Sequence, residues 1–211
     1  MDSAKIRLSP EEMVLVNRTD WILTKNNVLG KVKQLLSEIQ SAQHVVLQGF
    51  PDVPRQLAES SPKISRGENY RGLPWLVLDY PRLFDNKSFL SIRTLFWWGN
   101  FFSTTLHVSG KYKDAYVERI IGSFAYLQQK KFYICINGDE WQHHFEESNY
   151  ASIEEMNDSD FEKITRNNLF VKLAKKISLD QWNDAGAKLA DVFIQLIHIL
   201  RTSFPNGETD P

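Results

Sequence analysis

The amino-acid sequence predicts one α+β domain, in which helices from both ends of the chain pack on a central antiparallel sheet of about five strands. Two observations predict this class. Apolar residues recur at helical spacing near both ends, whereas short runs rich in aromatic and β-branched residues fill the middle of the chain. Gly-Asn and Asn-Gly dipeptides interrupt those runs, and such dipeptides favour β-hairpins. The length of 211 residues fits a single domain over residues 1–211, with flexible tails at residues 1–8 and 206–211.

Capping signals predict the first helices. Ser9-Pro10-Glu11-Glu12 combines a capping box with proline at the first helical position, so a short helix is expected to about residue 17. A second helical stretch is expected at residues 19–24, followed by a longer helix that Asn26 or Asn27 caps. The apolar residues of the longer helix fall on one stripe: Val28, Leu29, Val32, Leu35, Leu36, Ile39 and Val46.

Residues 49–72 differ from their surroundings in being polar and rich in proline and glycine. We expect a long loop here, with one helical turn near residues 55–59. Long loops inside compact domains are often functional. The loop is therefore a candidate part of a binding site.

Three strands are expected in the middle of the chain, at residues 73–80, 89–98 and 101–109. Gly99-Asn100 forms a two-residue turn between the last two, and this turn sets the register with Ile92 opposite His107. Directly opposed residues share a face, so Arg93 and His107 are predicted on opposite faces. The face with Arg93 is the more apolar and is expected to pack on helices. The face with His107 mixes aromatic rings with hydroxyls and is a candidate binding surface.

The second half of the chain adds a second hairpin and three helices. Helices are expected at residues 111–129, 159–176 and from 178 to about 200. Strands at 132–136 and 140–145, joined by Asn137-Gly138, form the hairpin. Ser178 and Gln181 form another capping box. Between residues 137 and 162 there are nine acids and no Lys or Arg, a composition typical of a solvated loop.

Composition excludes several classes of function. The net charge of −1 argues against a dedicated binder of nucleic acid or of membrane surfaces. The beginning of the chain has no signal-peptide pattern and no apolar run approaches ~20 residues, so a cytoplasmic protein without a membrane span is expected. The single cysteine, Cys135, cannot form an internal disulfide.

Known catalytic and cofactor motifs are also missing from the sequence. There is no phosphate loop, dinucleotide fingerprint, zinc spacing or nucleophile elbow, and no cofactor or metal is therefore expected. His143-His144 resembles a metal pair, but adjacent strand residues point to opposite faces. Residues 158–162 resemble a calcium loop only weakly and are expected to cap the next helix.

Polar residues inside predicted strands are the most informative candidates. A buried unpaired charge costs several kcal/mol, so Asp79 and Arg93 each need a partner. One interpretation is that they pair with each other or with the backbone and fix the strand register. The other is that they line a pocket and hold a polar ligand. His107 is either a hydrogen-bonded structural residue or, if functional, the best general acid or base.

The segment before the first predicted strand is locally basic. Residues 62–93 hold six basic and three acidic residues, and a loop rich in arginine beside aromatic rings suits an anion. Structural salt bridges are the alternative explanation for these charges. Trp97-Trp98 could stack nucleic-acid bases, or could form an aromatic core layer or a dimer contact. The candidate binding residues are Arg66, Glu68, Tyr70, Asp79, Arg93, Trp98 and His107.

Three functions remain open at the level of sequence. The first is a non-catalytic module that binds a small anionic molecule or a protein partner, with the C-terminal helix supporting a homodimer. The second is an enzyme in which His107 or His143 is the base and Arg66 or Arg93 clamps an anionic substrate. The third is a nucleic-acid-associated protein, which the neutral balance of charge disfavours. The lack of a catalytic constellation favours the first.

Overall fold

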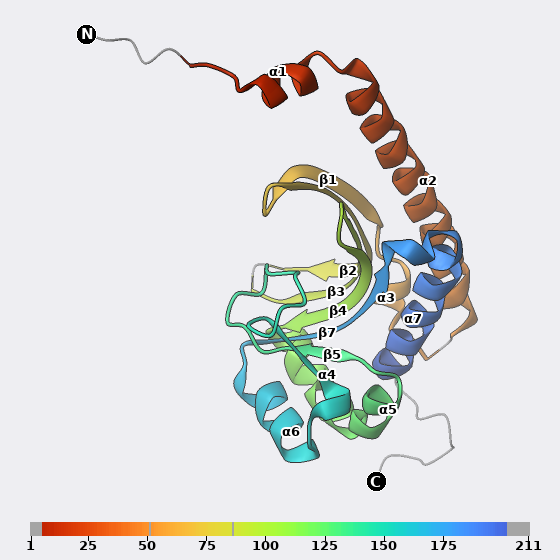
Figure 1. The fold of residues 1–211 in the computed structure, drawn as a ribbon. Helices are drawn as coiled ribbons and strands as arrows, with labels where there is room; N and C mark the ends of the chain where they lie inside the picture. The colour runs from red at the N-terminus through yellow and green to blue at the C-terminus, as the bar shows by residue number, and fades with distance from the viewer. Residues whose placement is uncertain (1–5, 51, 86, 202–211) are drawn as a thin grey trace.

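The computed structural model describes residues 6–50, 52–85 and 87–201, and its fold is α+β (Figure 1). One antiparallel sheet carries helices from both ends of the chain, as predicted, but the sheet has seven strands rather than about five. The tails predicted to be flexible lie outside the described residues, apart from residues 6–8. No helix within the described residues is long and apolar enough to cross a membrane.

The strands follow the spatial order β1-β2-β3-β4-β7-β5-β6. Their bounds are β1 Lys63–Tyr70, β2 Leu73–Phe84, β3 Phe89–Trp97, β4 Phe101–Ser109, β5 Tyr133–Cys135, β6 Tyr150–Ser152 and β7 Phe170–Ser178. The sheet curls strongly, so that it has a concave and a convex face (Figure 1). Alternate side chains of each strand therefore point into the concave space or toward the helices.

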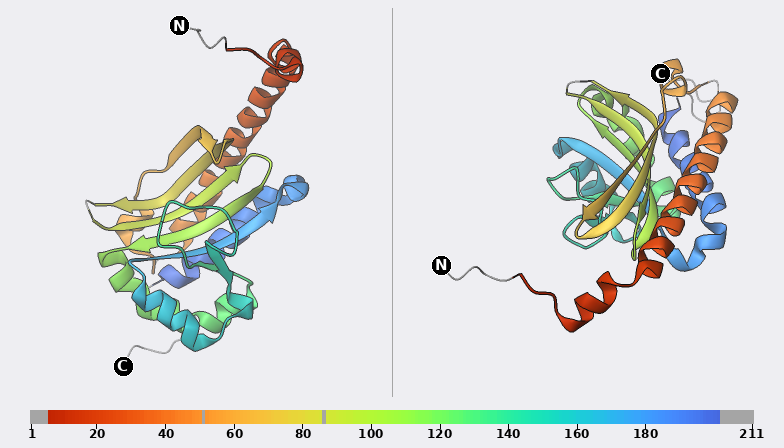
Figure 2. Two further views of the ribbon diagram at one scale, coloured as in Figure 1. Left: turned by 60° about the vertical axis from the view of Figure 1, so that its left-hand side comes forward. Right: turned by 90° about the horizontal axis from the view of Figure 1, so that it is seen from above.

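The helices of the described chain are α1 Pro10–Val16, α2 Thr19–Gly49, α3 Arg55–Ala58, α4 Lys111–Gly122, α5 Phe124–Gln129, α6 Asp158–Asn167 and α7 Ala185–Leu200, with short 3-10 helices at Ile153–Glu155 and Leu179–Asp184. Helices α2, α4 and α7 cover the convex face of the sheet, whereas α1 has no buried residue. Seen from above, α2 and α7 lie side by side behind the sheet (Figure 2). The main core joins them to convex-face residues such as Leu78, Ile92 and Phe102.

The N-terminal helices are partly as predicted. The capping box of α1 is confirmed, since the Ser9 hydroxyl accepts from the Glu12 N–H at 3.2 Å and the Glu12 carboxylate accepts from the Ser9 N–H at 2.6 Å. The prediction of a break near Asn26 or Asn27 is wrong, because α2 is one helix from residue 19 to residue 49. Its buried stripe, which begins at Leu29, packs on the sheet and α7, and such packing overrides a weak local capping preference.

The segment predicted as a long loop contains a strand. Its one helical turn is confirmed as α3, but residues 63–70 form β1, which pairs with β2 from Lys63 opposite Asp79 to Tyr70 opposite Leu73. Gly67 and the three charged residues of β1 have low strand propensity. Pairing with the long neighbour β2, rather than local preference, therefore makes this segment a strand.

The second half of the chain needs four corrections. The helix expected from residue 178 begins as the 3-10 helix Leu179–Asp184, and α7 begins only at Ala185. The expected capping box with Gln181 is not formed, because the Ser178 hydroxyl accepts from the Asp180 N–H at 3.3 Å. The predicted helix 111–129 is divided at Ser123 into α4 and α5. The strand expected at residues 140–145 is absent, and β6 is the partner of β5. The helix expected over residues 159–176 ends at Asn167, and residues 170–178 form β7 between β4 and β5. Because β7 is central and buried on both faces, its apolar run lacks the alternation that marks a half-buried strand.

The register of the β3–β4 hairpin differs by one residue from the predicted register. Trp97 lies opposite Phe101, so the turn spans residues 98–100 instead of Gly99-Asn100 alone, with Gly99 at a φ of +70°. Arg93 is then opposite Thr105, and His107 is opposite Ser91. A one-residue slip moves each side chain of one strand to the other face. Arg93 and His107 consequently share the concave face, contrary to prediction.

Candidate functional site

A cavity of about 610 Å³ lies in the concave face of the sheet. Strands β1, β2 and β3 supply most of its wall, and residues 136–149 between β5 and β6 supply the rest. We call residues 136–149 the strap, because they cross the concave side of the sheet (Figures 1 and 2). The lining residues are Lys63, Ser65, Asn69, Tyr70, Trp75, Val77, Asp79, Arg82, Phe84, Arg93, Leu95, Trp141 and His143.

Lys172 on β7 holds the strap to the sheet. Its side chain is fully buried, and its Nζ donates to the backbone carbonyls of Glu140 at 3.0 Å and Gln142 at 2.5 Å. Burial lowers the pKa of Lys172 to about 8, because the charged form loses its hydration. The Lys172 ammonium therefore positions the strap, because its N–H groups donate to strap carbonyls that border the cavity.

His107 fixes the strap at a second point. Its Nε2 lies 2.9 Å from the Glu140 carboxylate, and the hydrogen bond lowers the pKa of Glu140. The His107 side chain is 3% exposed, and its ring contacts Phe89 and Trp141. Burial lowers the pKa of His107, although Glu140 opposes this shift, so the imidazole is neutral near pH 7. The geometry favours the structural interpretation of His107 over that of an accessible base.

Tyr70 at the end of β1 makes the third attachment. Its hydroxyl accepts from the backbone N–H groups of His143 at 2.7 Å and His144 at 3.2 Å. Its carbonyl oxygen accepts from Trp97 Nε1 at 3.2 Å, and the two rings meet edge to face. The strap is thus joined to β1, β4 and β7, and these attachments place it along one side of the cavity.

Asp79 and Arg93 form an ion pair in the cavity wall. Arg93 Nε donates to Asp79 Oδ1 at 2.7 Å and Nη2 donates to Oδ2 at 3.1 Å, so the two residues pair with each other, as one of the two interpretations expected, while both also line the cavity. The third nitrogen, Nη1, lies 3.3 Å from His143 Nε2. Burial, with the positive charges of Lys172 and Arg93, lowers the pKa of His143 well below its usual range. The Nε2 of a neutral His143 can then accept a hydrogen bond from Arg93 Nη1.

Trp75 forms an aromatic wall of the cavity over a glycine on the neighbouring strand. Gly67 lies opposite Trp75, and a Cβ at Gly67 would lie 2.6 Å from the indole ring. The absence of a side chain at residue 67 is therefore what lets the ring lie flat against β1. Glycine in a strand often marks such a close approach.

Gly67→Ala is expected to displace the Trp75 ring and to cost about 1–3 kcal/mol of stability through overpacking. A shift in tryptophan emission and a urea titration would measure the two effects. Gly30→Ala is the matched control, since nothing lies within 4 Å of its added carbon in α2. The control is expected to stabilise by up to about 1 kcal/mol. Equal effects of the two substitutions would contradict the assigned contact.

The seven predicted site residues divide between the two faces of the sheet. Tyr70, Asp79 and Arg93 line the cavity, and His107 lies beneath the strap on the same face. The other three lie away from the cavity: Arg66 is opposite Leu76 of the main core, Glu68 pairs with Lys25 of α2, and Trp98 contacts Trp21 of α2. The structure therefore brings four of the seven together.

Sequence reasoning missed several residues of the site. Lys172 was expected in a helix, and Trp141 was expected in a strand without a role. Arg82 follows a shift in the register of β2, which extends beyond its predicted end at residue 80. The sequence does carry one signal for Lys172, since this lysine lies within the apolar run Phe170–Ala174. A buried cation requires acceptors, so its position indicates a contact with polar groups.

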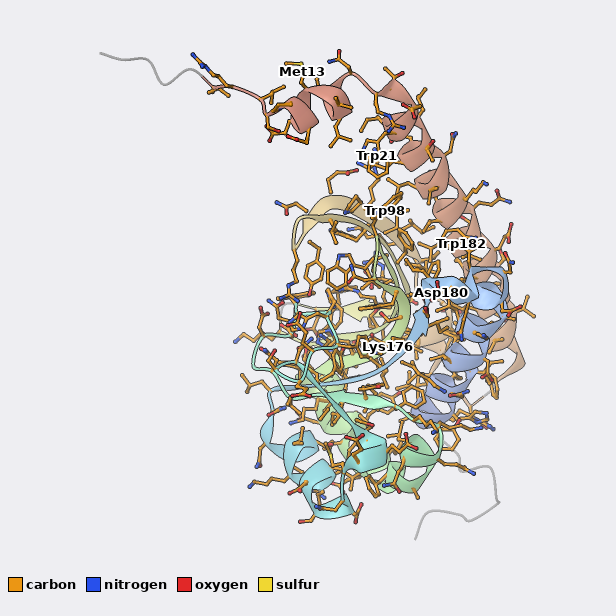
Figure 3. All side chains as sticks on the ribbon, viewed as in Figure 1. Met13, Trp21, Trp98, Lys176, Asp180 and Trp182 are labelled. Atoms are coloured by element: carbon orange, nitrogen blue, oxygen red, sulfur yellow. The ribbon has the colours of Figure 1, made fainter. Side chains whose placement is uncertain are left out.

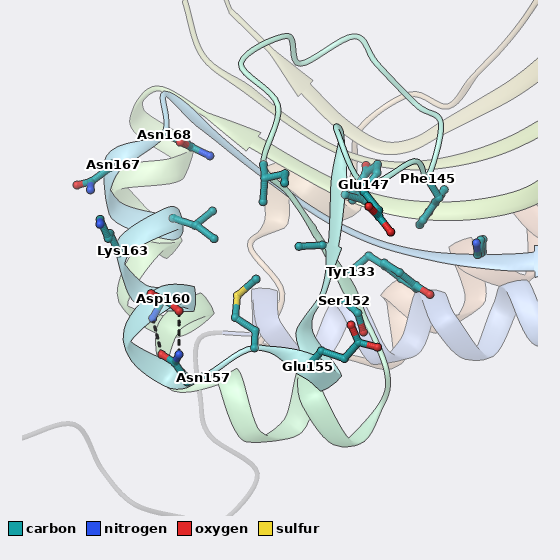
Figure 4. A pocket seen from close by; sticks show the side chains of 16 residues that line it. Tyr133, Phe145, Glu147, Ser152, Glu155, Asn157, Asp160, Lys163, Asn167 and Asn168 are labelled. Atoms are coloured by element: carbon teal, nitrogen blue, oxygen red, sulfur yellow. Dashed lines mark hydrogen bonds between the residues drawn. The ribbon is translucent and has the colours of Figure 1, made fainter.

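A second hollow of about 850 Å³ lies between α6 and the strands β5 and β6 (Figure 4). Asp160 of α6 and Asn157, the residue that caps this helix, line the hollow, but they bond to each other. Three carboxylates and two lysines line the hollow, so its charges nearly balance. The carboxylates are Glu147, Glu155 and Asp160, and the lysines are Lys163 and Lys176. This hollow therefore attracts a charged ligand less strongly than the concave cavity, where cations outnumber carboxylates.

Comparison with known proteins gives no indication of function. No family model matches the chain, and no match was found among curated proteins or solved structures. The function is therefore inferred from the shape and charge of the concave cavity.

Proposed function

We propose that this protein binds a small anionic molecule with a planar apolar part in the concave cavity, without transforming it chemically. One observation carries the proposal: three cationic side chains and a single carboxylate line the cavity, together with several aromatic rings. The cations are Lys63, Arg82 and Arg93, and the carboxylate is Asp79. A pocket that combines apolar walls with a few placed charges is the usual form of a small-molecule site.

The positive charge available to a ligand comes from Lys63 and Arg82. Asp79 neutralises Arg93, whereas neither Lys63 nor Arg82 forms an ion pair within the described part of the chain. Arg82 is held in place by a hydrogen bond from Nε to the Ser61 carbonyl at 2.9 Å. Its guanidinium also lies 5.1 Å from the Phe84 ring centre. A positioned guanidinium beside an aromatic ring suits a carboxylate, sulfonate or phosphate.

The aromatic residues supply the apolar part of the proposed site. Trp75, Tyr70 and Trp141 line the cavity from β2, β1 and the strap respectively. Aromatic side chains give large contact areas at low conformational cost. The proposed ligand is accordingly an aromatic or similarly planar acid, rather than a compact inorganic ion.

The contacts of the titratable groups support binding rather than catalysis. Lys172 donates to strap carbonyls, and His107 is buried against Glu140, so both hold the loop. The alternative enzyme uses His107 or His143 as base and Arg66 or Arg93 as clamp. Arg66 lies on the opposite face of the sheet from His107. Arg93 does lie beside His143, but its guanidinium is already bound to Asp79 and to the His143 ring. The proposal therefore assigns these side chains to shaping a preformed cavity.

The proposal is tested with 2-naphthoate and its uncharged counterpart, 2-naphthylmethanol. Binding is followed by quenching of tryptophan emission, because Trp75 and Trp141 line the cavity. The acid is expected to bind more tightly than the alcohol. Arg82→Gln is expected to weaken binding of the acid by about 10–100-fold, the value of a charge-assisted hydrogen bond.

Arg66→Gln is the matched control, because it removes an arginine from β1 on the other face of the sheet. It is expected to leave the affinity for 2-naphthoate unchanged. Equal binding of acid and alcohol, or equal affinity of wild type and Arg82→Gln, would refute the proposal. Failure of every planar acid in a wider panel to bind would refute it as well.

A further inference from the structure

The first part of the described chain forms an apolar arm, which we define as residues 6–25. It consists of α1 and the first turns of α2, and α1 has no buried residue. Nine large apolar side chains of the arm are between 47% and 99% exposed. They are Ile6, Leu8, Met13, Val14, Leu15, Val16, Trp21, Ile22 and Leu23. An exposed apolar surface of this size marks an interaction site.

The arm projects from the rest of the molecule. In the ribbon views α1 stands away from the sheet, and Met13 points into open space (Figures 1, 2 and 3). Only the base of the arm is fixed, where Trp21 meets Trp98 edge to face and Lys25 bonds to Glu68 at 2.5 Å. The described part of this chain therefore leaves α1 uncovered.

The apolar residues of the arm lie at consecutive positions. Residues 13–16 are all apolar and exposed, and so are residues 21–23. Since successive helical residues are about 100° apart, four in a row cover most of the circumference of the helix. A flat surface would cover one side of such a helix only. Because α1 and the start of α2 meet at a bend (Figure 1), the equally bent arm of a second copy can cover the arm from more than one side.

We propose that two copies of this chain pair through their arms. A two-fold contact uses the same surface on both copies, so that surface must be compatible with itself. The arm carries three basic and three acidic residues, and two identical arms therefore meet without net repulsion. Helices that lie on membrane surfaces instead have a strongly basic polar face. The charge of the arm favours a second copy over a lipid surface.

The apolar area of the arm is close to what a dimer needs. If each of the nine side chains buries on the order of 50 Å² of its exposed apolar surface, two arms bury about 900 Å². This is close to the size, about 1,000 Å², from which specific interfaces are recognised, and the polar atoms of the arms add to it. The C-terminal helix, which the sequence suggested for this role, already buries most of its apolar residues within the chain.

The test compares two matched valine substitutions in the full-length chain by sedimentation equilibrium. Val16 in α1 is 68% exposed and Val45 in α2 is 70% exposed, so neither change touches the core. Wild type and Val45→Glu are expected to be dimers at tens of micromolar. Val16→Glu is expected to raise the dimer dissociation constant at least tenfold. Thermal melting of each variant shows that it is folded.

Three results would overturn the proposal. The first is a monomeric wild-type protein, whether or not it sediments with phosphatidylcholine vesicles. The second is a dimer whose dissociation constant Val16→Glu leaves unchanged. The third is equal weakening by Val16→Glu and Val45→Glu, which would place the contact elsewhere. None of these results depends on the cavity, so ligand binding is tested independently.

Discussion

Asp79→Ala is expected to lower the free energy of unfolding by about 3–5 kcal/mol, the usual cost of removing one partner of a buried ion pair. The Asp79 and Arg93 side chains are 8% and 14% exposed, so water cannot replace the lost carboxylate fully. Arg93 would keep its contact with His143, whose neutral imidazole offers no balancing charge. The unpaired guanidinium is therefore the source of the expected loss.

The measurement is urea denaturation of wild type and variants at pH 7. Glu59→Ala is the matched control, because it breaks a Glu–Arg pair outside the arm whose side chains are 60% and 87% exposed. That change is expected to cost far less stability, because water screens an exposed pair. Replacing both partners, as Asp79→Leu with Arg93→Met, is expected to restore much of the stability lost in Asp79→Ala. Similar losses for Asp79→Ala and Glu59→Ala would show that the cavity pair contributes no more than a surface pair.

The stability of wild type relative to Lys172→Met is expected to rise by up to about 3 kcal/mol between pH 8 and 10.5. Burial lowers the pKa of Lys172 to about 8 in the folded chain, against 10.5 for a free lysine. Between these two values the unfolded state binds more protons than the folded state, so raising the pH favours folding. Below pH 8 both states are protonated, and the relative stability is expected to be level.

Urea denaturation at several pH values measures the difference in stability between wild type and Lys172→Met. Both proteins contain the same tyrosines, so the effect of tyrosine titration cancels in this difference. Lys176→Met corrects for the removal of a lysine from the same strand. Hydrogen exchange at residues 139–144 is also expected to be faster in Lys172→Met, because two strap carbonyls lose their donor. Parallel stability profiles of wild type and Lys172→Met from pH 7 to 10.5 would contradict the assigned burial of the ammonium.

The fold class and the elements with local signals could be predicted from the sequence. The capping box at Ser9 and the aromatic run of β3 are examples, because their patterns depend only on neighbouring residues. The location of β7 could not be predicted in this way. Its buried run Phe170–Ala174 suits a helix or a strand equally well, and only pairing with β4 decides between them.

The candidate site shows the same division. Asp79 and Arg93 were predictable, because charges inside apolar strands require partners. Their grouping with His107 was not, because the hairpin turn has one residue more than its Gly-Asn dipeptide suggests. The positions of Lys172 and of the strap residues depend on long-range contacts that no local pattern encodes.

Strand β1 forms one edge of the sheet, and an open edge offers backbone groups to which any other extended chain can add. Lys63, Arg66 and Glu68 place charge along this edge, and the register shift between Gly67 and Tyr70 interrupts its regular pairing. Charges and bulges of this kind protect natural sheets from growing into fibrils. The basic segment that suggested an anion site thus also guards against aggregation, and neutralising all three charges would expose the chain to it.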